Sequence, residues 1–160
     1  MKKTQKKLGN KGFSLVELIV VIAIMAVLIG VLAPTLIRNV EKSRESTDLQ
    51  NLDSIRTSVS TALSQESVAK DAPTALKVID YSTLSTTSTD AFVKALAQEM
   101  SDDSALGTQL KSKQAKTGKI YIIIDEKGKP TVGVYTAAPT AASATPVACA
   151  KNTGNSFISE

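Results

Sequence analysis

Hydrophobic and polar residues divide the chain into an apolar N-terminal stretch and a longer mixed remainder. The run from Leu18 to Ala33 contains no polar side chain, and only Pro34 and Thr35 interrupt it before Ile37. As a helix, residues 13–37 would be about 37 Å long, which exceeds the ~30 Å hydrocarbon core of a bilayer. The pattern therefore predicts one membrane-spanning helix.

Beyond residue 37, apolar residues recur at three- and four-residue steps, which predicts that the helix continues as an amphipathic one. The recurring positions are Ile37, Val40, Leu49, Leu52, Ile55, Val59, Ala62 and Leu63. The charged residues between them are expected on the solvent-exposed face: Arg44, Asp48, Asp53 and Arg56. Asp71-Ala72-Pro73 disfavours further helix, so the helix is expected to end near Lys70.

The clearest strand pattern lies in the last third of the chain. Two β-rich runs, residues 120–124 and 131–135, flank a turn that contains Gly128, which predicts an antiparallel hairpin. Two strands alone are marginally stable. A third strand is therefore expected from residues 75–81 or from the C-terminal tail.

The remaining segments are less regular. A short helix that ends near Met100 has an apolar face, and Ser88, Thr89 or Asp90 can cap it. Residues 101–119 favour neither helix nor strand. The tail, residues 137–160, is rich in Ala, Thr, Ser and Pro, and it either adds a short strand around residues 156–158 or remains a mobile surface segment.

Together these elements predict an α+β fold, in which one long N-terminal helix packs on a small antiparallel sheet. The helix is apolar in its first half and amphipathic in its second half, and the sheet belongs to a small head that depends on the helix for its stability. The expected domains are a lysine-rich segment (1–12), a membrane-spanning helix (13–37), its amphipathic continuation (38–70) and the α+β head (71–160).

The charged residues near the N-terminus indicate which kind of membrane segment this is. The leader contains five lysines and no acid, which places it in the cytoplasm. Glu17 lies inside the apolar run, where a carboxylate costs about 2.5–3.5 kcal/mol at mid-bilayer, and a simple anchor would have no use for it. No small-residue cleavage pattern follows Ala33, so the expected cut lies before the apolar segment, between Gly12 and Phe13.

Gly12-Phe13-x-x-x-Glu17 after a lysine-rich leader, followed by an apolar helix with Pro34, resembles the class III signal of type IV prepilins and pseudopilins. The resemblance covers about residues 2–40 and includes the long helix docked on a small sheet. It implies that a membrane prepilin peptidase cuts after Gly12 and methylates the new amine of Phe13, so that residues 1–12 are a cleaved leader and residues 13–37 become the filament-core helix. It also implies that Glu17 attracts the N-terminal amine of a neighbouring subunit during assembly.

The same resemblance implies that the helix loosens between Gly30 and Pro34 within a filament. Singly, each of these residues has a simpler interpretation. Glu17 could extend its carboxylate to the headgroups, and glycine and proline occur in ordinary membrane helices. It is their combination, in this order, that favours the prepilin interpretation.

Composition favours an exported structural protein over an enzyme or a nucleic-acid-binding protein. The net charge is +4, but without residues 1–12 the side chains total 14 bases and 15 acids. The chain has no histidine, which excludes a His-based catalytic triad or metal site. Asp102-Asp103 and Asp125-Glu126 lack the spacing of a metal-ligand set and are expected to be solvated loop acids. No cofactor, catalytic residue or metal ligand is therefore predicted.

Cys149 is the only cysteine, so no intrachain disulfide can form. Many pilins close a C-terminal loop with a disulfide, and this chain departs from that pattern. A disulfide-poor exported chain fits the pilins of Gram-positive, clostridial-type bacteria. Cys149 is expected to be an incidental thiol.

The predicted function is that of a structural subunit of a type IV pilus, used for adhesion, aggregation or surface motility. The alternative is a pseudopilin of a type II secretion or DNA-uptake machine, which would carry the same N-terminal motif. The low-complexity tail and the lack of an evident calcium-binding loop favour the pilin. A membrane-anchored enzyme or sensor is disfavoured because no catalytic constellation is visible.

The resemblance also implies partners and a location. The expected partners are further copies of the chain in a helical homopolymer, the prepilin peptidase and methyltransferase, and a membrane assembly platform with its ATPase. No specific nucleic acid is expected. The subunit would reside in the cytoplasmic membrane before assembly and in an extracellular pilus afterwards.

Overall fold

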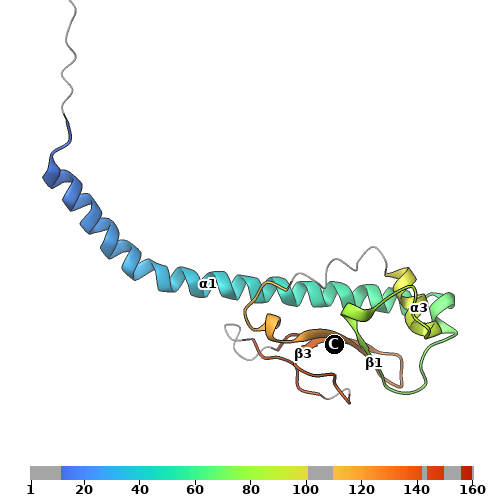
Figure 1. Ribbon diagram of the computed structural model, residues 1–160. Helices are drawn as coiled ribbons and strands as arrows, with labels where there is room; N and C mark the ends of the chain where they lie inside the picture. The colour runs from blue at the N-terminus through green and yellow to red at the C-terminus, as the bar shows by residue number, and fades with distance from the viewer. Residues whose placement is uncertain (1–11, 101–109, 142–143, 150–155, 160) are drawn as a thin grey trace, which may run out of the picture. The chain divides into compact units, whose positions relative to one another are not determined.

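The computed structural model describes residues 12–100, 110–141, 144–149 and 156–159 (Figure 1). The chain divides into an N-terminal unit, residues 1–37, and a C-terminal unit, residues 38–160. Helix α1 (Leu15–Leu63) begins in the first unit and ends in the second. The other elements all belong to the C-terminal unit: α2 (Glu66–Ala69), β1 (Lys77–Asp80), η1 (Tyr81–Thr83), α3 (Ala91–Glu99), η2 (Ala115–Thr117), β2 (Lys119–Ile124), β3 (Pro130–Tyr135) and β4 (Ile158–Ser159).

The N-terminal unit is helical from Leu15 onward, and its large apolar side chains are exposed along the whole length. By length and composition, α1 is the one helix of the described residues that could cross a membrane. Pro34 lies inside the helix, and helical structure continues on both sides of it. A surface this apolar requires lipid or other helices around it.

A four-stranded antiparallel sheet in the order β1-β2-β3-β4 forms the centre of the C-terminal unit. The predicted hairpin is confirmed, with Ile122 opposite Val132 and a positive φ at Gly128 in the turn. The predicted third strand is present as β1, although Tyr81 belongs to η1 instead. For the tail, the strand alternative is right, because β4 pairs with β3 and Ala148 pairs with Ser156.

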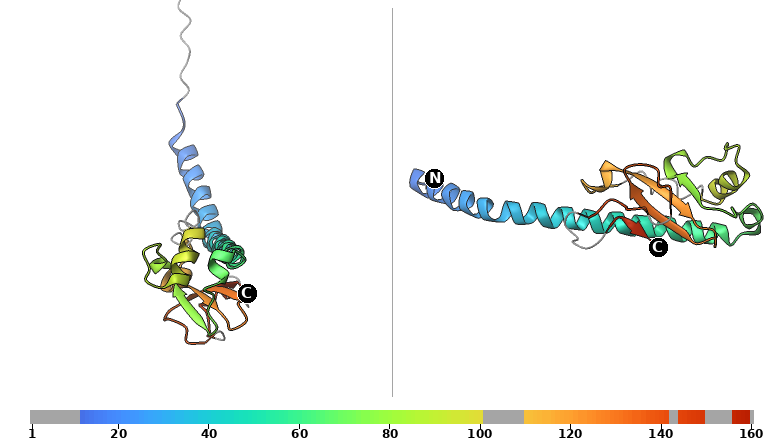
Figure 2. Two further views of the ribbon diagram at one scale, coloured as in Figure 1. Left: turned by 90° about the vertical axis from the view of Figure 1, so that its right-hand side faces the viewer. Right: turned by 90° about the horizontal axis from the view of Figure 1, so that it is seen from below.

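The second half of α1 lies along one face of this sheet (Figure 2). Leu52, Ile55 and Val59 are fully buried in a single core with alternate residues of β2 and β3. The members of this core on the two strands are Ile120, Ile122, Ile124, Val132 and Val134. The fold is therefore the predicted α+β arrangement of a long helix and a small antiparallel sheet.

The opposite face of the sheet is also covered. Tyr121, Ile123 and Tyr135 are buried there, and Ala144 of the C-terminal tail packs against them. The two tyrosine rings meet edge to face, with centroids 6.3 Å apart. Burial on both faces explains why β2 is almost continuously apolar, where a strand with one wet face would alternate.

Helix α1 ends at Leu63, before the predicted end near Lys70. Gln65 has extended backbone angles, and the chain then turns into the short helix α2, in which Val68 is fully buried. In a continuous helix Val68 would lie about 160° around the axis from Leu52, at 100° per residue, and would face solvent. The break at Gln65 lets Val68 join the core.

The prediction that Asp48 faces solvent is wrong: its side chain is fully buried, as is that of Glu45. Asp48 precedes Leu52 by four residues and Ile55 by seven, so it shares their helix face. Arg44 and Asp53 are exposed as predicted, whereas Arg56 is half-buried. Ile37 and Val40, at the start of the predicted stripe, are exposed.

The predicted short helix is confirmed as α3. Asp90 is its N-cap, and its carboxylate accepts a hydrogen bond from the backbone of Val93 at 3.1 Å. It also pairs with the ammonium of Lys77 on β1. The bond from Lys77, together with that from Val93, lowers the pKa of Asp90. The cap thus connects α3 to the edge of the sheet.

Candidate processing and assembly site

Gly12 and Phe13, the residues of the predicted cut, precede the first helical residue. Neither belongs to a helix or strand, and the Phe13 side chain is 93% exposed. Around Gly12, no atom lies within 4 Å of the position that a Cβ would occupy. An exposed, non-helical dipeptide is accessible to a peptidase.

Ser14 and Glu17 begin the helix together. The Ser14 hydroxyl accepts from the backbone of Val16 at 3.4 Å, and the Glu17 carboxylate accepts from the backbone of Ser14 at 2.8 Å. This is a variant of the capping box, in which Glu17 binds the N–H of Ser14 and the Ser14 hydroxyl binds the N–H of the second helical residue. The negative charge also lies at the positive end of the helix dipole. In the single subunit, Glu17 therefore already has a hydrogen-bond donor.

The capping box places the Glu17 carboxylate beside the backbone of the residue that follows Phe13. A cut after Gly12 would create an amine on Phe13, one residue away from the N–H that Glu17 binds. The carboxylate thus points towards the end of the chain where a positive charge would appear. The charge pattern of the sequence indicates Glu17 but not Ser14, although the spacing Ser14-x-x-Glu17 is visible in the sequence.

Gly30 and Pro34 lie within α1, and the helix continues through both. Pro34 has no N–H to donate to the carbonyl of Gly30, so the helix lacks one bond of its ladder there. No neighbouring atom approaches the open side of Gly30. Loosening of this segment within a filament stays a prediction.

Residues 7–33 match the family model described as the prokaryotic N-terminal methylation motif. This motif is the class III signal peptide found in type IV pilins, and here it covers the N-terminal part of the chain alone. The match includes Gly12, Phe13, Glu17 and Gly30 and ends one residue before Pro34. Comparison with curated proteins and with solved structures gave no match.

The motif defines the class of protein at a coarse level. It is the mark of a substrate of prepilin peptidase and of pilin-type assembly, and it does not define an enzyme family. Pilins and pseudopilins share this motif, so it fits either class and does not separate them. The motif and the exposed apolar helix fit membrane anchoring before assembly.

In the C-terminal unit, buried carboxylates of α1 hold the segment that leads into β2. Asp48 accepts from the backbone of Lys111 at 2.8 Å and from that of Ser112 at 2.7 Å. Asp48 and Lys111 are 63 residues apart in the sequence. Glu41, two helical turns before Asp48, accepts from the backbone of Lys113. These acids fix the position of residues 111–113 against the helix.

A second polar contact holds the C-terminal strand. The Arg56 guanidinium donates to the Ser159 hydroxyl at 2.9 Å, and that hydroxyl donates to Asp53 at 2.9 Å. Phe157, two residues earlier, is fully buried in the core. The C-terminal segment is therefore docked by a buried aromatic ring, by strand pairing and by a polar contact with α1.

Cys149 lies in this docked segment, with 7% of its surface exposed. Burial, with a further contribution from the negative charges of Glu45 and Asp48, raises its pKa to about 11. The thiol therefore stays protonated at neutral pH, and the nucleophilic thiolate is scarce.

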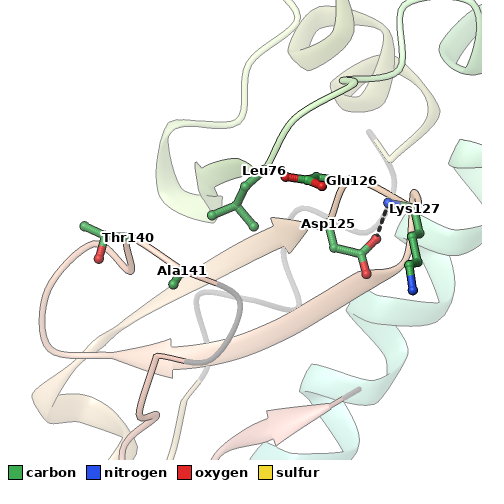
Figure 3. Close-up of a pocket in the computed structure, with 6 residues that line it drawn as sticks. All are labelled: Leu76, Asp125, Glu126, Lys127, Thr140 and Ala141. Carbon is green, nitrogen blue, oxygen red and sulfur yellow. Dashed lines mark hydrogen bonds between the residues drawn. The ribbon is translucent and has the colours of Figure 1, made fainter.

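An open pocket of about 330 Å³ lies beside the β2–β3 turn (Figure 3). Leu76, Thr140 and Ala141 line it together with the turn residues Asp125, Glu126 and Lys127. Asp125 accepts from the backbones of Lys127 and Lys129, at 2.9 and 2.7 Å, and so stabilises the turn. Asp102 and Asp103 lie outside the described residues. Within the described ranges, no three His, Cys, Asp or Glu residues group to hold a metal ion.

Proposed function

We propose that this chain is the structural subunit of a type IV pilus, used for adhesion, aggregation or surface motility. The observation that carries the proposal is the class III signal at residues 7–33, followed by an exposed apolar helix that leads into a small α+β unit. The tail rich in Ala, Thr and Ser supports a pilin over a pseudopilin.

Processing is the first proposed step. The prepilin peptidase cuts between Gly12 and Phe13, and the new amine of Phe13 is methylated. The exposed, non-helical Gly12–Phe13 backbone supports this assignment. The leader with its lysines then stays in the cytoplasm, while the helix remains in the membrane.

Assembly is the second step, and solvation explains its selectivity. Moving residues 13–37 from lipid into a bundle of identical helices exchanges one apolar environment for another. Packing and electrostatics must therefore supply the driving force. Glu17 binds the amine on Phe13 of a neighbouring subunit, and the pair sets the axial register. The capping box supports this role because it holds the carboxylate at the end of the helix where that amine would meet it.

The partners in this proposal are further copies of the chain, the prepilin peptidase, and a membrane assembly platform driven by an ATPase. The subunit passes from the cytoplasmic membrane to an extracellular filament. Because the helix lacks a hydrogen bond between the Gly30 carbonyl and residue 34, it can stretch locally as subunits pack.

Electron microscopy of cells with antibody against the C-terminal unit tests the proposal directly. Long surface fibres labelled along their length are expected, and they should disappear when the gene is deleted and return when it is restored. If fibres are absent while deletion abolishes protein secretion or DNA uptake, the chain is a pseudopilin instead.

A further inference from the structure

The fold separates acidic from basic side chains at the start of the C-terminal unit. Between residues 38 and 48, α1 carries three bases and three acids. The bases are all exposed: Arg38, Lys42 and Arg44. Of the acids, Glu45 and Asp48 are fully buried, and the Glu41 side chain is only 17% exposed. A charge-balanced stretch of sequence therefore presents a basic surface.

A second basic segment lies against the same part of the helix. The bonds from the backbones of Lys111 and Lys113 to Asp48 and Glu41 place residues 111–113 there. The side chains of both lysines are exposed, as is that of Lys116 in η2. The acids thus bind the backbone of this segment and leave its ammonium groups to solvent.

We call these six residues the basic collar: Arg38, Lys42, Arg44, Lys111, Lys113 and Lys116. Even with the carboxylates of Glu41, Glu45 and Asp48 counted against them, bases outnumber acids by two to one in this region of the described chain. The surrounding potential is therefore positive.

The sequence position of the collar relates it to the membrane. Arg38 directly follows Ile37, the last residue of the apolar stretch. At 1.5 Å per residue, Arg38 and Arg44 are about 9 Å apart along the helix. The headgroup layer is about 5–8 Å thick on each side of the hydrocarbon core. Because Arg38 directly follows the apolar stretch, the start of the collar must lie at the headgroups when that stretch spans the bilayer.

We propose that the basic collar binds the phosphate groups of anionic phospholipids in the membrane that anchors the unassembled subunit. The lysines of residues 111–116 let the C-terminal unit contact the membrane surface, in addition to the contact made by the helix. The interaction would hold the unit at the surface before assembly and would have to break as the subunit leaves the bilayer. The proposal depends on membrane anchoring and not on the choice between pilin and pseudopilin.

The test uses the full-length chain in lipid vesicles. A fluorophore is attached to Thr117→Cys in a Cys149→Ser background, and quenching by lipids with spin-labelled headgroups reports proximity to the surface. Vesicles of phosphatidylcholine alone are compared with vesicles that also contain phosphatidylglycerol. The basic variant is Lys113→Gln/Lys116→Gln. The matched control, Lys127→Gln/Lys129→Gln, removes the same charge from exposed lysines of the β2–β3 turn.

Stronger quenching is expected with phosphatidylglycerol, and high salt should weaken it. The ratio of surface-bound to free C-terminal unit should fall about fivefold for each collar lysine removed. The turn variant should behave like the parent, and circular dichroism should show all variants equally folded.

Equal quenching in the two kinds of vesicle would overturn the proposal. An equal loss of quenching in the collar variant and in the turn variant would also overturn it. It would also be wrong if the collar variant kept its lipid contact but lost binding to duplex DNA or to a second copy of the chain. Filament formation plays no part in the measurement. Absence of fibres on cells would therefore contradict the proposed function and leave this result unaffected.

Discussion

Among the carboxylates of α1, Glu17, Asp48 and Asp53 each determine a different local structure. Glu17 binds the backbone at the helix start, Asp48 binds the segment before β2, and Asp53 binds Ser159 at the far end of the chain. Carboxylates that accept hydrogen bonds from N–H groups make stronger bonds than neutral acceptors. Single substitutions at these positions should therefore affect different properties: assembly for Glu17, and the stability of different parts of the C-terminal unit for Asp48 and Asp53.

Gly12→Val should block processing without disturbing the subunit. Nothing lies near the added side chain, so any effect reports the requirement of the peptidase. Mass spectrometry of the membrane fraction should show uncut chain, whereas the parent should begin at a methylated Phe13. Gly30→Ala, at another open glycine, is the control and should be cut normally. A mature chain that begins after Ala33 would contradict the assigned cut.

Glu17→Gln separates helix capping from charge. The amide oxygen can still accept from the Ser14 N–H, so the helix start is preserved, but the charge is lost. An unpaired cation in the filament core costs about 3–5 kcal/mol. We expect Glu17→Gln and Glu17→Ala to be inserted and cut, yet to form few or no fibres when each is the only pilin copy, with Glu17→Asp intermediate.

The reciprocal variant is Ser14→Ala, which removes the hydroxyl cap, worth about 1 kcal/mol, and keeps the charge. It should assemble nearly normally. Electron microscopy and the amount of sheared fibre give the readout. If Glu17→Gln assembles like the parent, capping and not charge pairing is the role of Glu17.

Asp48→Ala should destabilise the C-terminal unit by about 1–3 kcal/mol, because the buried N–H of Ser112 and the partly buried N–H of Lys111 lose their acceptor. Asp48→Asn keeps one acceptor oxygen and should lose less. Urea unfolding of the detergent-solubilised chain, followed by circular dichroism, measures the difference. Ser54→Ala on the exposed face of the same helix is the control, expected within about 0.5 kcal/mol of the parent. Equal stability of Asp48→Ala would show that water replaces the carboxylate.

At the scale of elements, the C-terminal segment is attached to the sheet without a covalent bond. Val147 donates to Val134 at 2.8 Å, Phe157 donates to Val147 at 2.8 Å, and Val134 donates to Phe157 at 2.9 Å. These bonds and the pairing of β4 add the tail to the edge of β3. In this chain, backbone pairing and the buried ring of Phe157 attach the C-terminal segment that many pilins close with a disulfide.

Phe157→Ala should release this segment. Loss of a buried phenyl ring costs about 3–5 kcal/mol, and the pairing around it should weaken with it. Cys149, buried with a pKa of about 11, should react slowly with a thiol reagent in the parent and much faster in the variant. Thr140→Ala, an exposed change in the same tail, should leave the rate unchanged. Slow labelling of the Phe157→Ala variant would indicate that other contacts hold the segment.

At the scale of the whole molecule, the two units need different surroundings to be stable. Of the residues before Arg38 that the structure describes, 12–37, none belongs to either hydrophobic cluster of the C-terminal unit. The apolar surface of the N-terminal unit needs lipid or other copies of the helix, whereas the C-terminal unit has its own core.

Residues 38–160 alone should therefore form a soluble, folded monomer. A cooperative thermal transition in circular dichroism and a monomeric mass in light scattering would show it. A fragment of residues 50–160 is the matched comparison, because it lacks Glu41, Glu45 and Asp48, and it should be much less stable. Aggregation of the longer fragment would mean that the apolar helix is part of the fold.

The sequence by itself determined the N-terminal signal, the long helix, the hairpin and α3. Each depends on residues that are close together in the chain: the order of lysine, Gly12, Phe13 and Glu17, the apolar run, and the spacing of apolar residues in single elements. The candidate processing and assembly residues can therefore be predicted from the sequence. The capping partner Ser14 could also have been predicted from the sequence, because it lies three residues before Glu17.

Only the tertiary structure decided which polar residues are buried and which strands pair with the tail. Asp48 shares a helix face with Leu52, but the backbone donors that make its burial possible are 63 residues away. The contact of Ser159 with Asp53 spans 106 residues. Periodicity describes one element at a time, whereas the free energy of burying a carboxylate depends on the donors that another element brings to it.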